Sequence, residues 1–89
     1  MSRIMESIFV CSSEFLSEPY NISRSIEIGV THIIIDSSSV GKHLQDKFEL
    51  LAIDESEFTY SFKVVPKIMD FVRKTTLYRG RLLFVEKSG

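Results

Sequence analysis

One short segment, Val30–Ile35, limits the folds open to this chain more than any other feature. Five of its six residues are β-branched, and His32 alone breaks that pattern. Such a run is typical of a central strand buried on both faces of a sheet, because a strand exposed on one face alternates apolar and polar residues. The sequence therefore predicts an α/β fold in which helices pack on a sheet with some parallel strand pairs.

Shorter apolar runs predict the remaining strands. They lie at 8–11, 47–53 and 81–85, and each is bounded by polar or turn-forming residues. Ile4 and Met5 are expected to pair beside the first of these strands or to fray. The prediction is therefore a mixed sheet of four or five strands.

Two main helices are predicted between these strands. One covers about 18–28, because Pro19 suits a first helical turn and Gly29 suits the left-handed residue after a helix end. The other begins near Val64 or Val65 and ends near residue 77, since Pro66 would break a helix interior. The apolar stripe expected to face the sheet on this second helix consists of Val65, Ile68, Met69, Val72 and Thr76.

Length and charge exclude several classes of function. With 89 residues the chain forms a single domain, 1–89. Eleven Lys and Arg against twelve Asp and Glu leave no basic excess for nucleic acid and no charged block for a membrane surface. The longest apolar runs are too short to span a bilayer. A single cysteine excludes an internal disulfide, so a reducing, cytoplasmic location is expected.

Taken one at a time, the polar residues predict little chemistry. Neither a glycine-rich phosphate loop nor metal-ligand spacing is visible, so no cofactor and no metal are expected. Each candidate residue has a plainer interpretation: Cys11 as a core residue, His32 and His43 as structural or solvated residues, and Asp54, Glu55 and Glu57 as a solvated loop.

Three stretches taken together change this interpretation. They are Asn21-Ile22 with Gly29–Ile34, then Ile53–Phe58, then Asp70-Phe71 with Gly80–Val85. In this order and spacing the chain resembles the dual-specificity protein phosphatases, in a catalytically degenerate form of the serine/threonine/tyrosine-interacting type. The resemblance implies the N-terminal part of that fold, without its C-terminal helices, in a domain that is incomplete at its C-terminus.

The resemblance also assigns a pseudo-active site. In the family the last strand leads into His-Cys, two further residues, Gly and then Arg. Here Val85 stands where the His would be, Glu86 where the catalytic Cys would be, and Ser88 and Gly89 follow, with no Arg. Asp54 matches the family's general acid.

A carboxylate at position 86 removes the chemistry that the family uses. The family needs a thiolate of low pKa that attacks phosphorus and forms a covalent intermediate. A carboxylate instead repels a phosphate dianion, by about 4 kcal/mol per charge pair at roughly 4 Å near a protein surface. We therefore expect no enzymatic activity, and we expect Asp54 to be a relic or a residue that organises its loop.

Three functions remain open at this stage. The first is an inactive phosphatase-like module that binds proteins. The second is a fragment of a longer phosphatase-like protein, or a hydrolase whose missing groups come from a partner. The third is a small α/β structural subunit of an assembly. Because two helices are unable to cover both faces of such a sheet, one face is expected to stay open for a protein partner or a second copy. The exposed patch is expected on alternate residues of strand 81–85.

Overall fold

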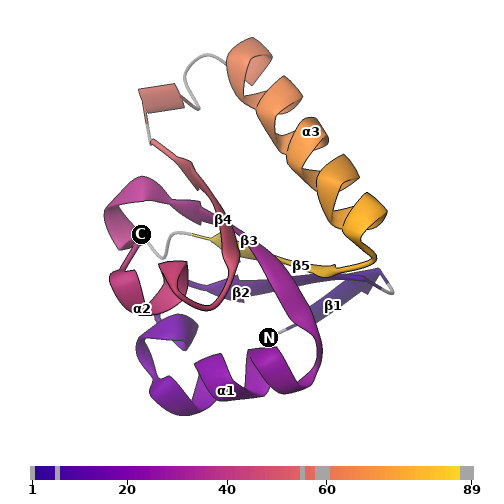
Figure 1. Cartoon of the computed structure of the whole chain (residues 1–89). Helices are drawn as coiled ribbons and strands as arrows, with labels where there is room; N and C mark the ends of the chain where they lie inside the picture. Colours follow the sequence, from indigo (N-terminus) through magenta and orange to yellow (C-terminus); the bar gives the residue numbers. More distant parts are fainter. Residues whose placement is uncertain (1, 6, 55, 58–60, 87–89) are drawn as a thin grey trace.

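The chain folds into one five-stranded sheet with helices on both faces (Figure 1). The computed structural model describes residues 2–5, 7–54, 56–57 and 61–86, with only the backbone described for 2–5 and 61. The strands are β1 (Ser2–Met5), β2 (Ile8–Ser12), β3 (Val30–Asp36), β4 (Glu49–Ile53) and β5 (Arg81–Glu86); the helices are α1 (Pro19–Glu27), α2 (Lys42–Gln45) and α3 (Ser61–Tyr78), with 3₁₀ turns at Phe15–Ser17 and Ser37–Ser39.

The strand order is β1-β2-β5-β3-β4, so β5 lies at the centre although it comes last in the chain. Strands β2, β5, β3 and β4 are parallel, and β1 pairs antiparallel with β2. The predicted mixed α/β sheet is therefore confirmed. Its central strands are buried on both faces, since Ile33 and Leu83 are fully buried from one side and Ile34 and Leu82 are nearly so from the other.

Helix α1 covers one face of the sheet together with α2 and the first 3₁₀ turn. Pro19 occupies the first helical turn and Gly29 takes a φ of 92° after the helix end, both as the sequence predicts. Ser17 does not cap the helix, because its hydroxyl donates to the Glu14 carbonyl instead. Ile22 carries α1 onto the core of this face.

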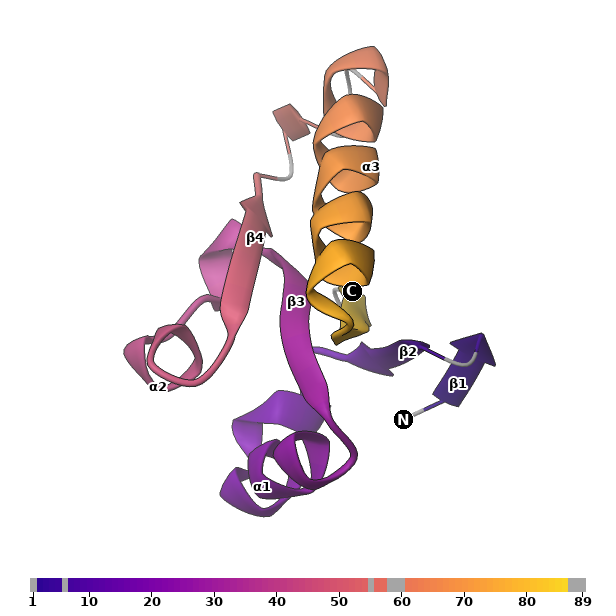
Figure 2. The ribbon, with the colours of Figure 1, turned by 45° about the vertical axis from the view of Figure 1, so that its right-hand side comes forward.

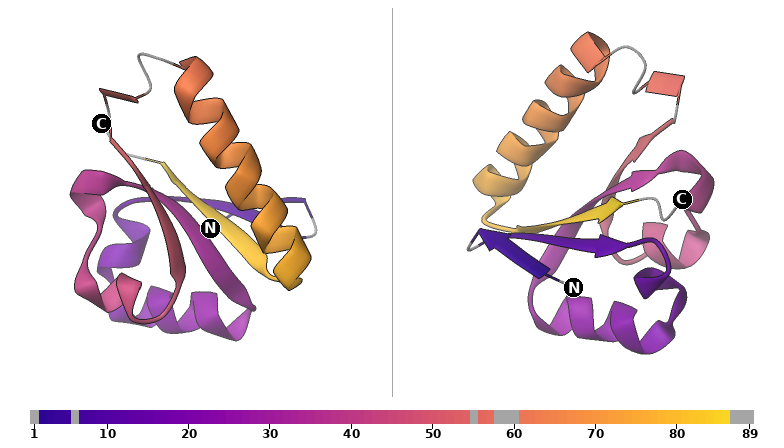
Figure 3. Two further views of the ribbon diagram at one scale, coloured as in Figure 1. Left: turned by 45° about the horizontal axis from the view of Figure 1, so that its top comes forward. Right: turned by 180° about the vertical axis from the view of Figure 1, so that it is seen from behind.

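Helix α3 covers the opposite face, and Figure 3 shows α1 and α3 on either side of the sheet. It begins at Ser61, earlier than predicted, and it includes Pro66. The missing N–H of Pro66 removes at most one helical hydrogen bond, near the N-terminal end of the helix. A proline this close to the N-terminus therefore does not set the helix boundary.

The predicted core stripe of α3 is wrong in its rotation. Val64 and Thr75 are buried, whereas Val65 is 48 % exposed and Met69 is 66 % exposed. Of the five predicted core-facing residues, only Ile68 and Val72 pack against the buried cluster under α3. The helix therefore turns a different side to the sheet than its hydrophobic pattern predicts.

The exposed apolar patch expected on strand 81–85 is also not found among the described residues. Leu82 is only 2 % exposed and Phe84 is half-buried, because α3 lies over this side of the sheet. The prediction that two main helices leave one whole sheet face open is wrong, since each face receives one of them. The exposed apolar side chains gather on α3 instead. Of the seven large ones among the described residues, α3 carries Phe62, Val65, Met69, Leu77 and Tyr78.

No helix among the described residues could span a bilayer. Even α3, with 18 residues, is not long and apolar enough to cross one.

Candidate functional site at the carboxyl edge of the sheet

The two acidic residues singled out in the sequence lie at the same edge of the sheet. Glu86 is the last residue of β5, and Asp54 directly follows β4. The carboxyl ends of parallel strands meet at one edge, which in open α/β sheets is the side where ligands bind. Strand β3 lies between the two, so the strand ends that carry Asp54 and Glu86 are about 10 Å apart across the sheet.

Asp36 occupies the place between them, at the end of β3. Its backbone pairs in register with Ile53, one residue before Asp54. The Asp36 carboxylate is buried and accepts hydrogen bonds from the Ser38 backbone N–H (3.1 Å) and the Ser38 hydroxyl. Asp36 was not predicted as part of this edge, although the sequence contains a shared signal: an apolar strand runs directly into an acid in Ile35-Asp36, Ile53-Asp54 and Val85-Glu86.

Asp54 organises the turn that follows β4. Its carboxylate accepts the Ser56 N–H at 3.3 Å, and its own N–H donates to the Glu57 carboxylate at 2.9 Å. This reciprocal pattern matches a capping box, in which two acids satisfy the free N–H groups at the start of a helical turn. These two hydrogen bonds agree with the loop-organising role that was one of the two expectations for Asp54. Glu55 lies outside the described residues.

Glu57 links this turn to α3. Its carboxylate accepts a hydrogen bond from the Lys67 ammonium as well as from the Asp54 N–H. These two donors, Lys67 first, lower the pKa of Glu57, since both favour the charged carboxylate. Glu57 is therefore an anchoring group between β4 and α3 rather than a free acid.

Val85 and Glu86, which the resemblance places at the family's His and Cys positions, differ in their burial. Val85 is buried in the core on the α1 side. Glu86 is exposed, and its backbone carbonyl accepts the Ser13 N–H at 2.9 Å. Ser88 and Gly89 lie outside the described residues. The strand end thus presents a carboxylate to solvent beside the β2 end, at Ser12.

Cys11 is the chain's single cysteine, and it lies one strand away from Glu86. It pairs in register with Val85, and its side chain is buried in the α1-side core. Burial raises the pKa of the thiol from 9.0 to about 11, and the Glu86 charge adds to the increase although the N-terminal ammonium opposes it. A thiol with this pKa is protonated at neutral pH.

The histidines lie apart from this edge. His32 is buried near the start of β3; its Nδ1 is 2.6 Å from the Thr31 hydroxyl, and its ring meets the Phe71 and Tyr78 rings edge-on at 5.5 and 5.4 Å. Burial lowers its pKa, against an opposing effect of Glu49. His43 is exposed on α2. Both positions agree with the structural and solvated roles predicted from the sequence.

An open hollow of about 1060 Å³ lies at the other end of the sheet. Its walls come from the start of β3, the β4 edge and the C-terminal half of α3. Both charge signs line it, with Lys47 and Lys74 against Asp46 and Glu49. The hollow therefore does not form part of the edge that carries Asp54 and Glu86.

The chemistry available at the carboxyl edge follows from its charges. Asp36, Asp54 and Glu86 are all acids, and a phosphate at these strand ends would meet carboxylates instead of N–H donors. Among the described residues, no group of three or more His, Cys, Asp or Glu is arranged to hold a metal ion. The edge is thus suited to hydrogen bonding with cationic or neutral groups.

Comparisons with known proteins add no identification. No protein-family model, no curated protein and no solved structure matches this chain.

Proposed function

We propose that this chain is a catalytically inactive, dual-specificity-phosphatase-like domain that acts as a protein-binding module. The observation that carries the proposal is the carboxylate of Glu86 at the end of the central strand, where the resembling family needs a thiolate. Further support comes from Asp36 and Asp54 at the neighbouring strand ends, which add negative charge where a phosphate dianion would sit.

A small aryl phosphate tests the catalytic half of the proposal. Purified chain is incubated with p-nitrophenyl phosphate, and released nitrophenolate is measured against Glu86→Ala and Asp54→Asn. We expect no turnover above buffer in any of the three. Turnover by the wild-type chain that Glu86→Ala abolishes would refute the proposal, because Glu86 would then act as a nucleophile or base. We also expect no binding of orthovanadate. Binding is monitored by the near-UV circular dichroism of the tyrosines, since the chain contains no tryptophan.

A second function is a structural subunit of a larger assembly. The specific observation in its favour is the group of large exposed apolar side chains on α3, since apolar side chains that gather on one element are typical of interaction surfaces. Sedimentation of the purified chain separates the two: a binding module is folded and monomeric alone, whereas an obligate subunit is unfolded or aggregated without its assembly.

A further inference from the structure

Helix α3 carries a second, mainly apolar face beside the one that packs on the sheet. The residues that contact the sheet side repeat at Val64, Ile68, Phe71 and Thr75. The second face is mostly exposed, with Phe62 70 %, Met69 66 % and Val65 48 % exposed. Half-buried Val72 lies where the two faces meet, because it also packs against the buried cluster under α3. We call it the α3 seam, and it consists of Phe62, Val65, Met69, Val72 and Thr76.

The spacing of the seam indicates the shape of its occupant. Successive members are three, four, three and four residues apart, which is the 3.5-residue period of a coiled coil. In that geometry each apolar side chain inserts between four residues of a facing helix. The seam runs for about 21 Å along α3, or four turns. A helix therefore fits this surface better than an extended strand, whose side chains repeat every two residues.

Charge around the seam indicates the composition of that helix. Residues 61–81 contain six Lys and Arg against one acid, Asp70, whereas the rest of the chain contains five Lys and Arg against eleven acids. Lys67 and Lys74 are already paired with Glu57 and Asp70. Arg73 follows the seam residue Val72, and no ion pair joins it to another described residue.

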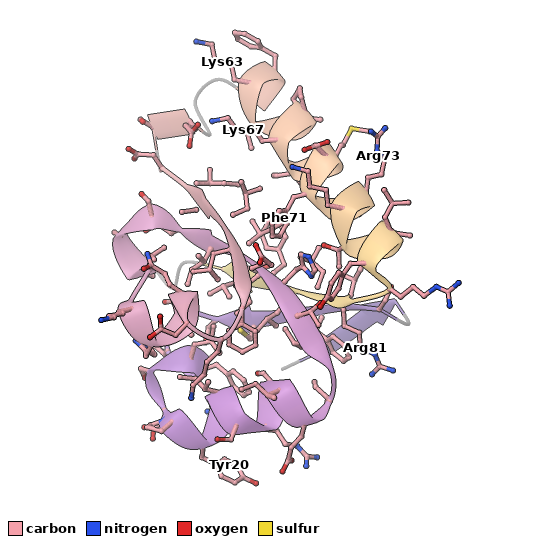
Figure 4. All side chains as sticks on the ribbon, viewed as in Figure 1. Tyr20, Lys63, Lys67, Phe71, Arg73 and Arg81 are labelled. Atoms are coloured by element: carbon pink, nitrogen blue, oxygen red, sulfur yellow. The ribbon has the colours of Figure 1, made fainter. Side chains whose placement is uncertain are left out.

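The basic side chains of α3 point in different directions. In Figure 4, Lys67 points from α3 toward the segment after β4, and Arg73 points from the opposite side of the helix toward solvent. Figure 2 shows the helix standing upright beside the sheet, with β4 and β2 on opposite sides of it. Arg73 is thus placed to meet an acidic group that comes from outside the described fold.

We propose that the α3 seam binds an amphipathic helix of a partner protein, with apolar residues in heptad spacing and acidic residues beside them. The inference rests on the proposed protein-binding role, but it does not depend on whether Glu86 makes the chain catalytically inactive. A second copy of this chain is a poorer occupant, since its own α3 would bring the same basic segment against Arg73. The driving terms are burial of the seam and a charge pair at Arg73.

The test uses the full chain and a synthetic probe. The probe is a fluorescein-labelled 21-residue peptide with Leu at heptad positions a and d and Glu at e and g; a second peptide has Lys in place of Glu. Binding is measured by fluorescence anisotropy at low and high salt. We expect the Glu peptide to bind and the Lys peptide to bind at least about tenfold more weakly.

Single substitutions test whether the peptide binds at the α3 seam. Met69→Ser is expected to weaken binding of the Glu peptide about tenfold, and Arg73→Gln is expected to weaken it and to reduce its salt dependence. Leu77→Ser is the matched control, because Leu77 is 77 % exposed against 66 % for Met69 and lies on the same helix outside the seam; it is expected to leave binding unchanged. Circular dichroism verifies that each variant is folded.

Several outcomes would overturn the inference. They are no binding of the Glu peptide by folded chain, equal binding of both peptides, equal losses for Met69→Ser and Leu77→Ser, a stable dimer that Met69→Ser dissociates, or binding to anionic phosphatidylserine vesicles in place of the peptide. Phosphatase turnover, by contrast, would refute the proposed inactivity and leave the peptide result untouched.

Discussion

The Glu57 carboxylate, in the turn after β4, accepts a hydrogen bond from the Lys67 ammonium on α3. Two parts of the chain that are ten residues apart are joined by this bond at the carboxyl edge of the sheet. The same carboxylate accepts the Asp54 N–H, so one side chain holds both the turn and the helix. The contact therefore links the N-terminal half of α3 to the turn after β4.

Replacing Glu57 is therefore expected to change the acid stability of the fold. The Lys67 bond lowers the folded-state pKa of Glu57 below its ordinary value of 4.5. Its contribution is thus complete above pH 4.5 and is lost as the pH falls through the lowered pKa. Glu57→Gln should have a lower melting temperature at pH 7, and the gap to the wild-type chain should close in stronger acid. A gap that is independent of pH would contradict the ion pair.

His32 gives a second pH dependence, in a different range. Burial lowers its pKa below 6.5, so the unfolded chain takes up this proton more readily than the folded one. Stability is expected to fall as the pH drops from 6.5 through the folded-state pKa. NMR titration of the imidazole should give a pKa for His32 below the ordinary value of 6.5. Titration of the His32 ring at 6.5 would show that the contacts with Phe71 and Tyr78 do not exclude water.

The end of α3 contains a strained residue that can be relieved. Arg79 takes a φ of 60°, and the next N–H, from Gly80, donates to the Thr75 carbonyl at 2.9 Å. This is a Schellman ending with a non-glycine residue in the left-handed position. Arg79→Gly is expected to stabilise the fold by about 0.5–1 kcal/mol in urea unfolding, because a left-handed conformation costs a side-chain-bearing residue roughly 1–2 kcal/mol.

The neighbouring glycine is expected to respond in the opposite direction. A Cβ on Gly80 would lie 2.0 Å from the Thr31 hydroxyl and 3.1 Å from Nδ1 of His32. Gly80→Ala should therefore destabilise the fold by about 1–3 kcal/mol, as overpacking does. Equal effects of Arg79→Gly and Gly80→Ala, in either direction, would contradict this assignment of the two positions.

Gly80 also shows which features of the fold could be predicted from the sequence. Gly80 correctly marks the link between α3 and β5, but its absence of a side chain serves the close approach of Thr31 from a strand 49 residues earlier. The strands could be predicted because their apolar runs are local signals. The same holds for α1, whose Pro19 and Gly29 define its ends.

The rotation of α3 could not be predicted from its own pattern, because the helix has two apolar faces. Val64 and Phe71 form one, Val65 and Met69 the other, and both repeat at helical spacing. The sheet and the Glu57–Lys67 bond select between them, and both are tertiary contacts. For the carboxyl edge, the sequence placed Asp54 and Glu86 at strand ends but gave no strand order, so it missed Asp36 between them.

The thiol of Cys11 provides the last prediction. Its pKa of about 11, against 9.0 for an ordinary thiol, leaves about a hundredfold less thiolate at pH 7.5. Reaction with dithiobisnitrobenzoate should be at least that much slower in the folded chain than in 6 M urea. Because the raised pKa disfavours ionisation in the fold, stability should also fall as the pH rises from 9 toward 11, and Cys11→Ala should remove that loss. Rapid labelling of the folded chain would show instead that β2 exposes the sulfur beside Glu86 and would reopen the question of a nucleophile at this edge.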